Sequence, residues 1–213
     1  PDGVSFASGS DDGALRLWNT QTGVGINTLS GHWDRVNDVA FSPDGNRLAA
    51  AYRSGSEGAK VFVWTLEGAL VQSFDWTDRM ALRVVFGPDG NQLLTTSHNG
   101  DAYLWDVPTG GLLQSFAGHT NWVQAAAVSA NGSRVLTGSD DGTAALHDTA
   151  TSSVLKTFPH PGEWVLAVAF SPDENQILTG ASDGGVRLWD VASEEIVLNL
   201  DGLSGPVSAA RFS

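Results

Sequence analysis

The sequence predicts an all-β protein, a β-propeller of four-stranded antiparallel blades with five repeats in this chain. A turn signal of the Pro-Asp-Gly type recurs about 42 residues apart, as expected for a repeat architecture. A short apolar run ending in Trp or a substitute recurs with the same period. The turns begin at Pro1, Pro43, Pro88, Ala130 and Pro172, and the runs end at Trp18, Trp64, Trp105, His147 and Trp189.

Within one period the apolar segments are short, rich in β-branched and aromatic residues, and separated by Gly, Asp and Pro. Examples are residues 36–42, 93–97, 102–105 and 112–116. No segment keeps a helical period for as many as about ten residues. Each unit therefore supplies four strands, and stacking the units around a ring would cover both apolar faces of every sheet.

Composition excludes several classes of function. The chain has 213 residues, of which 41% are hydrophobic and 16% charged, and its net charge is −13. No apolar run approaches the roughly 18 residues of a membrane span, so we expect no membrane insertion. Lys and Arg number only 11, so we expect no nucleic acid partner. Without cysteine there is no disulfide and no thiolate metal site.

The full motif resembles the WD-repeat family. Gly-His is followed by an apolar strand with Phe-Ser-Pro-Asp-Gly, then Leu-x-Thr-Gly-Ser-x-Asp-Gly, then a strand ending in Trp-Asp, and the resemblance covers the whole chain. It implies a propeller, usually of seven blades, and a structural hydrogen-bond network of His, Ser or Thr, Asp and Trp in each unit. Matching positions are His32, Ser8, Asp12, Trp18, Trp64, Thr95, Trp105, His119, Thr137, Asp141, His147, Thr179, Asp183 and Trp189.

No unit matches that network completely. His147 replaces Trp in the fourth unit, and Ala50 replaces the hydroxyl residue in the second. In the fifth unit, His160 lies one place out of register. We expect these departures to affect the rigidity of single blades and not the fold.

We expect a single propeller domain over residues 1–213, with repeats at approximately 1–30 together with 202–213, 31–74, 75–116, 117–158 and 159–201. Joining Phe212-Ser213 to Pro1-Asp2-Gly3 restores Phe-Ser-Pro-Asp-Gly without a gap. This leaves two alternatives, a closed five-bladed ring or a segment of a seven-bladed one. The lack of an initiator Met favours a segment of a longer protein.

The candidate binding residues lie in two sets of loops that should open on one face of the propeller. One set leads into the first strand of each unit, and the other joins the second and third strands. Large aromatic, Met and Arg side chains are enriched at the centre of protein interfaces. The candidates are Trp33, Arg35, Trp76, Met80, Trp122, Trp164, Tyr52, Arg53 and His98.

We expect no catalytic residues, no cofactor and no metal. His119, Thr137, Asp141 and His147 offer an imidazole, a hydroxyl and a carboxylate, but the resemblance assigns these positions to structural hydrogen bonds. Asp11-Asp12 and Asp140-Asp141 precede Gly as in fragments of calcium loops, yet the further oxygen ligands are absent. No glycine motif that opens a helix is present to bind phosphate.

The sequence therefore predicts a non-catalytic scaffold that binds a protein or peptide partner across the loop face, around the central channel. The resemblance implies a place in a larger assembly or multidomain protein. Two alternatives remain open. One is an aromatic cage for a small cationic ligand or a modified lysine, and the other is a purely structural spacer in a longer protein.

Overall fold

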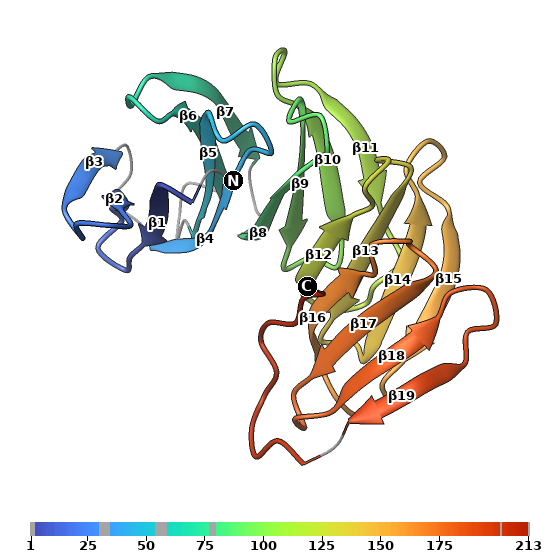
Figure 1. Ribbon diagram of the computed structural model, residues 1–213. Helices are drawn as coiled ribbons and strands as arrows, with labels where there is room; N and C mark the ends of the chain where they lie inside the picture. The colour runs from blue at the N-terminus through green and yellow to red at the C-terminus, as the bar shows by residue number, and fades with distance from the viewer. Residues whose placement is uncertain (1–2, 30–34, 54–58, 77–79, 201, 213) are drawn as a thin grey trace. The chain divides into compact units, whose positions relative to one another are not determined.

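In the computed structural model, every regular element is a β-strand within the described residues, which are 3–29, 35–53, 59–76, 80–200 and 202–212 (Figure 1). The strands form five sheets in which chain neighbours pair antiparallel. Both the all-β prediction and the prediction of repeated blades are confirmed. By their internal contacts the residues divide into two compact units, 1–95 with 104–113, and 96–103 with 114–213.

The first unit holds two complete sheets. The first sheet has three strands, in the order β1-β2-β3, because this repeat begins at its second strand, and the second sheet has the order β4-β5-β6-β7. The strands are β1 (Ser5–Gly9), β2 (Leu15–Asn19), β3 (Gly25–Leu29), β4 (Val36–Phe41), β5 (Arg47–Tyr52), β6 (Ala59–Thr65) and β7 (Leu70–Trp76).

The division into units passes through the third sheet, which has the order β11-β10-β9-β8. Its strands are β8 (Ala81–Phe86), β9 (Gln92–Ser97), β10 (Ala102–Asp106) and β11 (Leu112–Phe116). The strands expected at 36–42, 93–97, 102–105 and 112–116 are thus β4, β9, β10 and β11, each correct to within one residue at either end.

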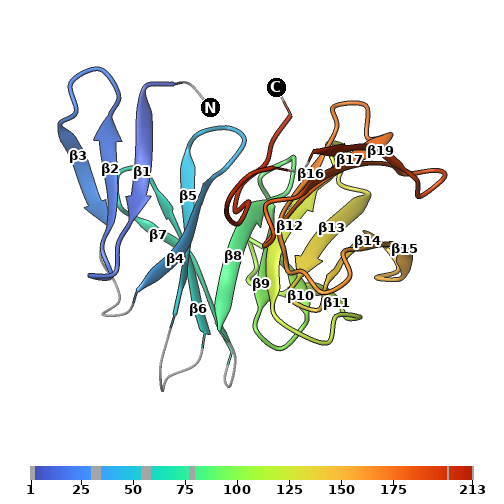
Figure 2. The same cartoon turned by 90° about the horizontal axis from the view of Figure 1, so that it is seen from below.

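The second unit holds the last two sheets, in the orders β12-β13-β14-β15 and β16-β17-β18-β19. Within this unit the two sheets lie side by side, with β12 next to β16 (Figure 1 and Figure 2). Their strands are β12 (Val123–Val128), β13 (Arg134–Ser139), β14 (Thr143–Asp148), β15 (Val154–Pro159), β16 (Val165–Phe170), β17 (Gln176–Ala181), β18 (Val186–Asp190) and β19 (Ile196–Leu200).

The core lies between successive sheets, not within one sheet. One apolar cluster joins Phe74 of the second sheet to Leu93 of the third, and another joins Phe158 of the fourth to Ile177 of the fifth. Burying side chains of this size stabilises the fold by about 1.5–3 kcal/mol each. The third-strand tryptophans pack into this core as expected: Trp64 and Trp189 are buried, and Trp18 and Trp105 are half-buried.

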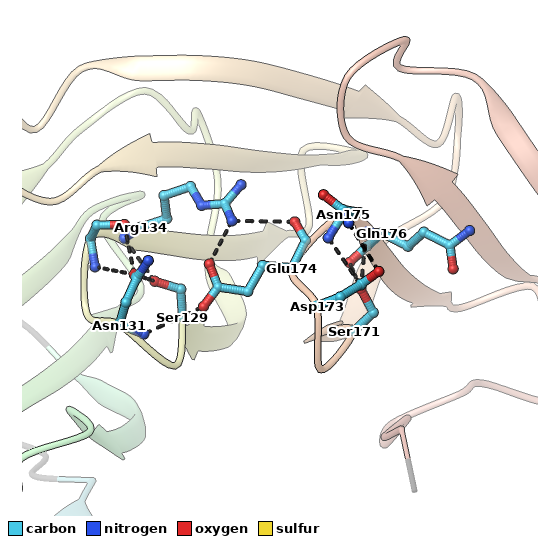
Figure 3. Close-up of polar contacts among 9 residues, drawn as sticks. Ser129, Asn131, Arg134, Ser171, Asp173, Glu174, Asn175 and Gln176 are labelled. Atoms are coloured by element: carbon cyan, nitrogen blue, oxygen red, sulfur yellow. Dashed lines mark hydrogen bonds and ion pairs between the residues drawn. The ribbon is translucent and has the colours of Figure 1, made fainter.

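The turns between first and second strands are held by a recurring side-chain pattern, shown for the last two sheets in Figure 3. The Ser171 hydroxyl donates to Asp173 Oδ1 at 2.6 Å and accepts from the Gln176 N–H at 3.0 Å. Ser129 makes the same contacts with Asn131, at 2.9 Å, and with the Arg134 N–H, at 3.0 Å. Such Asx-type bonds close a turn locally, which explains why this signal recurs in the sequence.

Glu174 stands in the fifth of these turns where the other repeats have Gly. Its φ is 58°, a left-handed conformation that disfavours side chains. In return, its carboxylate pairs with the guanidinium of Arg134 in the preceding sheet, and both side chains are largely buried, at 11% and 25% exposed (Figure 3). Arg134 also lies over the Phe170 ring, 5.7 Å from its centroid. Glu174 therefore links two successive sheets.

We expect the Arg134–Glu174 pair to show a coupling free energy of about 1–2 kcal/mol, because both side chains are mostly shielded from solvent and the guanidinium lies within hydrogen-bond distance of the carboxylate. The measurement is a double-mutant cycle on urea unfolding with Arg134→Gln, Glu174→Gln and the double variant. The matched control cycle uses the exposed pair Asp12 and Arg16, for which less than about 0.5 kcal/mol is expected. Equal coupling in the two cycles would contradict this assignment.

Candidate functional site

The two predicted sets of loops meet at one end of the strands in three of the sheets. In three sheets the residue after the second strand donates its N–H to the carbonyl of the residue before the first strand. These bonds run from Arg53 to Arg35, from Asp140 to Trp122 and from Ser182 to Trp164, each at 2.9 Å. The backbone of both loops is therefore held in place by these hydrogen bonds. In each unit we call this end of the strands the loop face; it carries Arg35 and Arg53 in the first unit, and Trp122, Asp140, Trp164 and Ser182 in the second.

In the second unit, the loop face exposes two tryptophans at equivalent positions. Trp122 is 38% and Trp164 is 55% exposed, unusually large fractions for this side chain. The His98 ring stands edge-on to Trp122, with centroids 6.3 Å apart and an interplanar angle of 86°. Beside Trp164, the Ser182 hydroxyl accepts from the Trp164 N–H at 3.0 Å and donates to Glu163 at 2.7 Å.

In the first unit, the described residues of the loop face are mainly charged. The Nε of Arg35 lies 3.0 Å from Asp11 Oδ1, and both side chains remain mostly exposed, at 55% and 78%. Arg53 is exposed and Met80 is half-buried. Because exposed ion pairs exchange readily with solvent, Arg35 and Asp11 remain accessible to a partner.

Two predictions for this face are wrong. Tyr52 does not project from a loop: it ends β5, is fully buried, and stacks edge-on against Phe62 and Trp64, with centroids 5.7 and 6.3 Å away. Burial also raises the pKa of its phenol to about 12. Trp76 is the last residue of β7, where its backbone pairs with Ala59, and so does not lie in the connection to the next sheet. Trp33 and His32 lie outside the described residues.

The fourth sheet contains a continuous network of buried polar side chains. The His119 ring places Nδ1 2.9 Å from Asp141 Oδ2 and Nε2 2.8 Å from the Thr137 hydroxyl. The same hydroxyl lies 3.1 Å from His147 Nε2. The tautomer that satisfies all partners has His147 protonated on Nε2, so that this imidazole donates to Thr137 as an indole would.

Tryptophan fills the equivalent donor position in three other sheets. Trp18 donates to Ser8 at 2.8 Å, Trp105 to Thr95 at 2.9 Å, and Trp189 to Thr179 at 2.8 Å. In the second sheet Ala50 has no hydroxyl, and Trp64 stacks on Phe62 with centroids 5.4 Å apart. Asp12, Asp141 and Asp183 each accept from the backbone N–H two residues further along the chain. They differ in their other partners, because Asp12 pairs with Arg16 and Asp141 with His119.

His160 is part of the fifth network, although the sequence places it out of register. Its Nε2 lies 2.8 Å from the Thr179 hydroxyl, which also accepts from Trp189. β11 ends at Phe116, which is equivalent to Phe158, whereas β15 continues to Pro159. β15 is therefore one residue longer at this end. The signal for this role in the sequence is a histidine one place before the expected Gly-His position.

Burial shifts the pKa values of these networks. Desolvation lowers the pKa of His147 to about 4, with a further contribution from the charge of His119. Desolvation also lowers the pKa of His160 to about 4, assisted by Arg187 and opposed by Asp183. Burial alone would raise the pKa of Asp141, but hydrogen bonds from Thr143 and Thr120, and the charge of His119, lower it overall.

The networks are suited to holding strands together. Thr137, His147, His160 and Thr179 are each at most 1% exposed, so a ligand cannot reach them. Among the described residues there is no group of three or more His, Cys, Asp or Glu side chains that could hold a metal ion. Over the same residues, no helix is present that is long and apolar enough to cross a membrane.

One set of contacts between successive sheets involves residues that the sequence analysis does not single out. The third residue of the outer strand reaches a backbone carbonyl of the next sheet in four repeats. In each case a side-chain nitrogen donates to a backbone carbonyl oxygen: Asn27 to Leu66 at 3.1 Å, Gln72 to Val107 at 3.4 Å, Gln114 to Ala150 at 2.8 Å, and Lys156 to Ala192 at 2.9 Å. Their recurrence with the repeat period is the signal by which they could have been found.

Comparison with known proteins yields relatives that share part of the chain. The nuclear distribution protein nudF of Aspergillus flavus is 31% identical over 110 residues, which are 52% of this chain and 24% of that protein. Autophagy-related protein 16 of Arabidopsis thaliana is 32% identical over 114 residues, 52% of this chain and 22% of that protein. An LST8 homolog of Drosophila pseudoobscura pseudoobscura is 32% identical over 114 residues, 49% of this chain and 35% of that protein.

This chain thus spans between 22% and 35% of the length of these relatives. The family model described as "WD domain, G-beta repeat" matches five successive stretches, residues 1–19, 23–65, 69–106, 110–148 and 152–190. Each stretch ends at the Trp-Asp position, or its substitute, of one sheet. Proteins with this repeat generally act as non-catalytic scaffolds for protein interactions. By its motifs, its sheets and these five matches, the chain belongs to the WD-repeat family.

Proposed function

We propose that this chain is a non-catalytic scaffold that binds a protein or peptide partner through the loop face, with Trp122 and Trp164 as the main contacts. The observation that carries the proposal is the exposure of these two rings, at 38% and 55%, on backbone that the sheets hold in place. Tryptophan brings a large contact area with little conformational freedom to lose, and it is enriched among residues that dominate binding energy.

The polar residues around the two rings favour a partner with basic or hydrogen-bonding groups. Glu163 and Ser182 lie beside Trp164. Asp140 donates its backbone N–H to the Trp122 carbonyl, and its carboxylate accepts from Gln124 at 3.0 Å. With a net charge of −13, the chain attracts a positively charged partner at long range. Within the second unit, His98 beside Trp122 would supply a further contact. On the first unit, Arg35, Arg53 and Met80 stay candidate contacts.

The experiment is affinity capture from a lysate of source cells, followed by titration of the captured partner against variants. The double variant Trp122→Ala, Trp164→Ala should bind at least about 30-fold more weakly, because each central tryptophan contributes about 1–2 kcal/mol or more. The matched control is Val154→Ala, Leu155→Ala, which removes side chains that are 45% and 48% exposed on β15. All variants should melt at similar temperatures.

Retention of the partner by the tryptophan variant would contradict the proposal, as would an equal loss in the β15 control. The aromatic-cage alternative requires two or three indole rings to converge. One aromatic neighbour of Trp122 is the His98 imidazole. That alternative predicts saturable quenching of tryptophan fluorescence by tetramethylammonium. The spacer alternative predicts that neither variant changes any interaction.

A further inference from the structure

The turn between β12 and β13 carries asparagine where the other repeats carry aspartate. Asn131 stands at the position of Asp44, Asp89 and Asp173, and Gly132 follows it. Two asparagines of the chain, Asn99 and Asn131, are followed by glycine. Such a pair can lose its side-chain amide, because glycine has no Cβ to keep its backbone nitrogen away from the asparagine side-chain carbonyl carbon. The contacts of the two sites decide how readily this happens in the folded chain.

The Asn131 side chain has its carbonyl oxygen engaged and its amide nitrogen free. Oδ1 accepts from the Ser129 hydroxyl at 2.9 Å, the Ser133 hydroxyl at 2.7 Å and the Ser133 N–H at 2.9 Å. Nδ2 makes no hydrogen bond to the described residues. Because the Ser133 N–H needs an acceptor, the oxygen must occupy this place. Three donors on Oδ1 stabilise the negative charge that forms there when a nucleophile attacks the carbonyl carbon, and nothing holds the leaving nitrogen.

The Asn99 side chain is held in the opposite way. Its Nδ2 donates to Asp101 Oδ2 and to the Tyr103 hydroxyl, both at 3.0 Å, and its Oδ1 accepts from the Asp101 N–H at 3.2 Å. Gly100 is buried, and a Cβ added to it would lie 2.4 Å from the His119 carbonyl oxygen. The backbone here has little room to rotate its nitrogen toward the side chain, and departure of the amide would break two hydrogen bonds.

One contact opposes the same reaction at Asn131. The Gly132 N–H donates to the Ser129 carbonyl at 2.9 Å, and this bond must open before the nitrogen can attack. Asn131 and Ser133 are exposed and Gly132 is half-buried. Water can therefore take over both partners of the opened bond, which makes the net cost of one such bond modest. The cost is smaller than that of two side-chain bonds and tightly packed backbone at Asn99.

From these contacts we infer that Asn131 is a site of spontaneous deamidation, and that the turn accepts the resulting aspartate. The Gly132 nitrogen bonds to the side-chain carbonyl carbon, its proton passes to the amide nitrogen, and ammonia leaves, so that a succinimide ring remains. Water then adds its hydroxyl to the former side-chain carbonyl and its proton to the Gly132 nitrogen, which restores the peptide bond; addition at the other carbonyl gives isoaspartate. Water is the one co-reactant. The inference does not depend on the function proposed for the loop face.

The equivalent turn of the fifth sheet shows that an aspartate suits this position. Asp173 Oδ1 accepts from the Ser171 hydroxyl at 2.6 Å and from the Asn175 N–H at 3.2 Å, as Asn131 Oδ1 does from its own turn. These hydrogen bonds, that of Ser171 first, lower the pKa of Asp173 and favour its charged form. Deamidation adds a negative charge beside the contact between the fourth and fifth sheets, since the Asn131 N–H donates to Glu174 Oε1 at 3.4 Å (Figure 3).

The test incubates the folded chain at mildly alkaline pH and follows both asparagines by peptide mass spectrometry. Cleavage after Arg83 and Arg134 releases one peptide, residues 84–134, that contains Asn99 and Asn131. Fragment ions therefore compare the two sites within the same sample. We expect Asn131 to convert at least about tenfold faster than Asn99. In concentrated urea, where the contacts of the fold are absent, the two sites should convert at similar rates.

Three variants test the contacts and the product. Ser133→Ala removes one donor from Oδ1 and should slow conversion of Asn131 by about threefold or more. Ser193→Ala is the matched control, because its hydroxyl donates to Asp190 Oδ1 at 2.9 Å in another turn, and it should leave the rate unchanged. Asn131→Asp should melt at the native temperature or above it, because the aspartate keeps the turn bonds.

Three results would overturn the inference. Equal rates at Asn99 and Asn131 in the folded chain would mean that the different contacts of their amides do not matter. Faster conversion in Ser133→Ala than in the native chain would mean that the turn protects Asn131. A melting temperature of Asn131→Asp below the native value would mean that the turn does not accept the product.

Discussion

Lowering the pH from 6.5 to 4 should reduce the free energy of unfolding by up to about 6 kcal/mol, because two buried histidines resist protonation in the folded state. The pKa of His147 and of His160 is lowered from 6.5 to about 4 by desolvation. A depressed folded-state pKa means that the unfolded chain binds the proton first, so stability is complete above pH 6.5 and is lost as the pH falls toward 4. Each histidine contributes about 3 kcal/mol to this loss.

The geometry of the two rings supports this direction. In both, Nδ1 is buried with no hydrogen-bond partner among the described residues, so protonation would bury an unpaired N–H. The carboxyl pKa values of Asp44, Asp141 and Asp173 are lowered from 3.8, so their stabilisation is lost only under more acidic conditions.

The measurement is the free energy of urea unfolding at several pH values between 7.5 and 4.5, with circular dichroism as the signal. The double variant His147→Gln, His160→Gln keeps a side-chain N–H donor at each position but cannot titrate, and its stability should change much less over this range. A native stability that is flat between pH 6.5 and 4.5, or a double variant with the native slope, would contradict the expectation.

Replacing Thr179 with Val should destabilise the chain by about 3 kcal/mol. The Thr179 hydroxyl is fully buried and joins Trp189 Nε1 and His160 Nε2, both at 2.8 Å. Valine keeps the shape of the side chain but leaves the indole N–H without an acceptor and the imidazole without its partner. Each buried polar group that loses its partner costs about 1–3 kcal/mol.

The control is Thr96→Val, the same substitution at an equally buried residue. The Thr96 hydroxyl has no hydrogen-bond partner among the described residues, so its removal should leave stability unchanged or raise it by up to about 1 kcal/mol. Chemical denaturation of the two variants gives the comparison directly. Similar losses in both would mean that the Thr179 contacts contribute little.

The repeat period and the turn chemistry were sufficient to predict the sheets. Strands such as β4 and β11 were expected within one residue of their observed ends, because a Ser-Pro-Asp-Gly turn and a period-two strand are encoded by neighbouring residues. The three-stranded first sheet follows from the same reading, since residues 1–30 begin at a second strand. The pairing of residues 202–213 with this first sheet concerns both compact units and stays a prediction.

The loop-face predictions were less successful, for a physical reason. Trp122 and Trp164 are exposed as expected, but Tyr52 turns into the core against Phe62 and Trp64. An aromatic residue at the end of a strand can point to either side, and only the space left by neighbouring side chains decides which. The role of the partly exposed tryptophans stays a proposal until binding is measured.

The repeat period, the turns and the strand composition are properties of short segments, and they were enough to predict a series of β-sheet repeats of the WD type. Which side chains are buried and which are exposed became clear from the three-dimensional packing. It placed His160 against Thr179 and Arg134 against Glu174. These outcomes depend on contacts between residues about 20–40 positions apart, in adjacent strands or successive sheets, and burial is a property of the packed neighbours rather than of the residue.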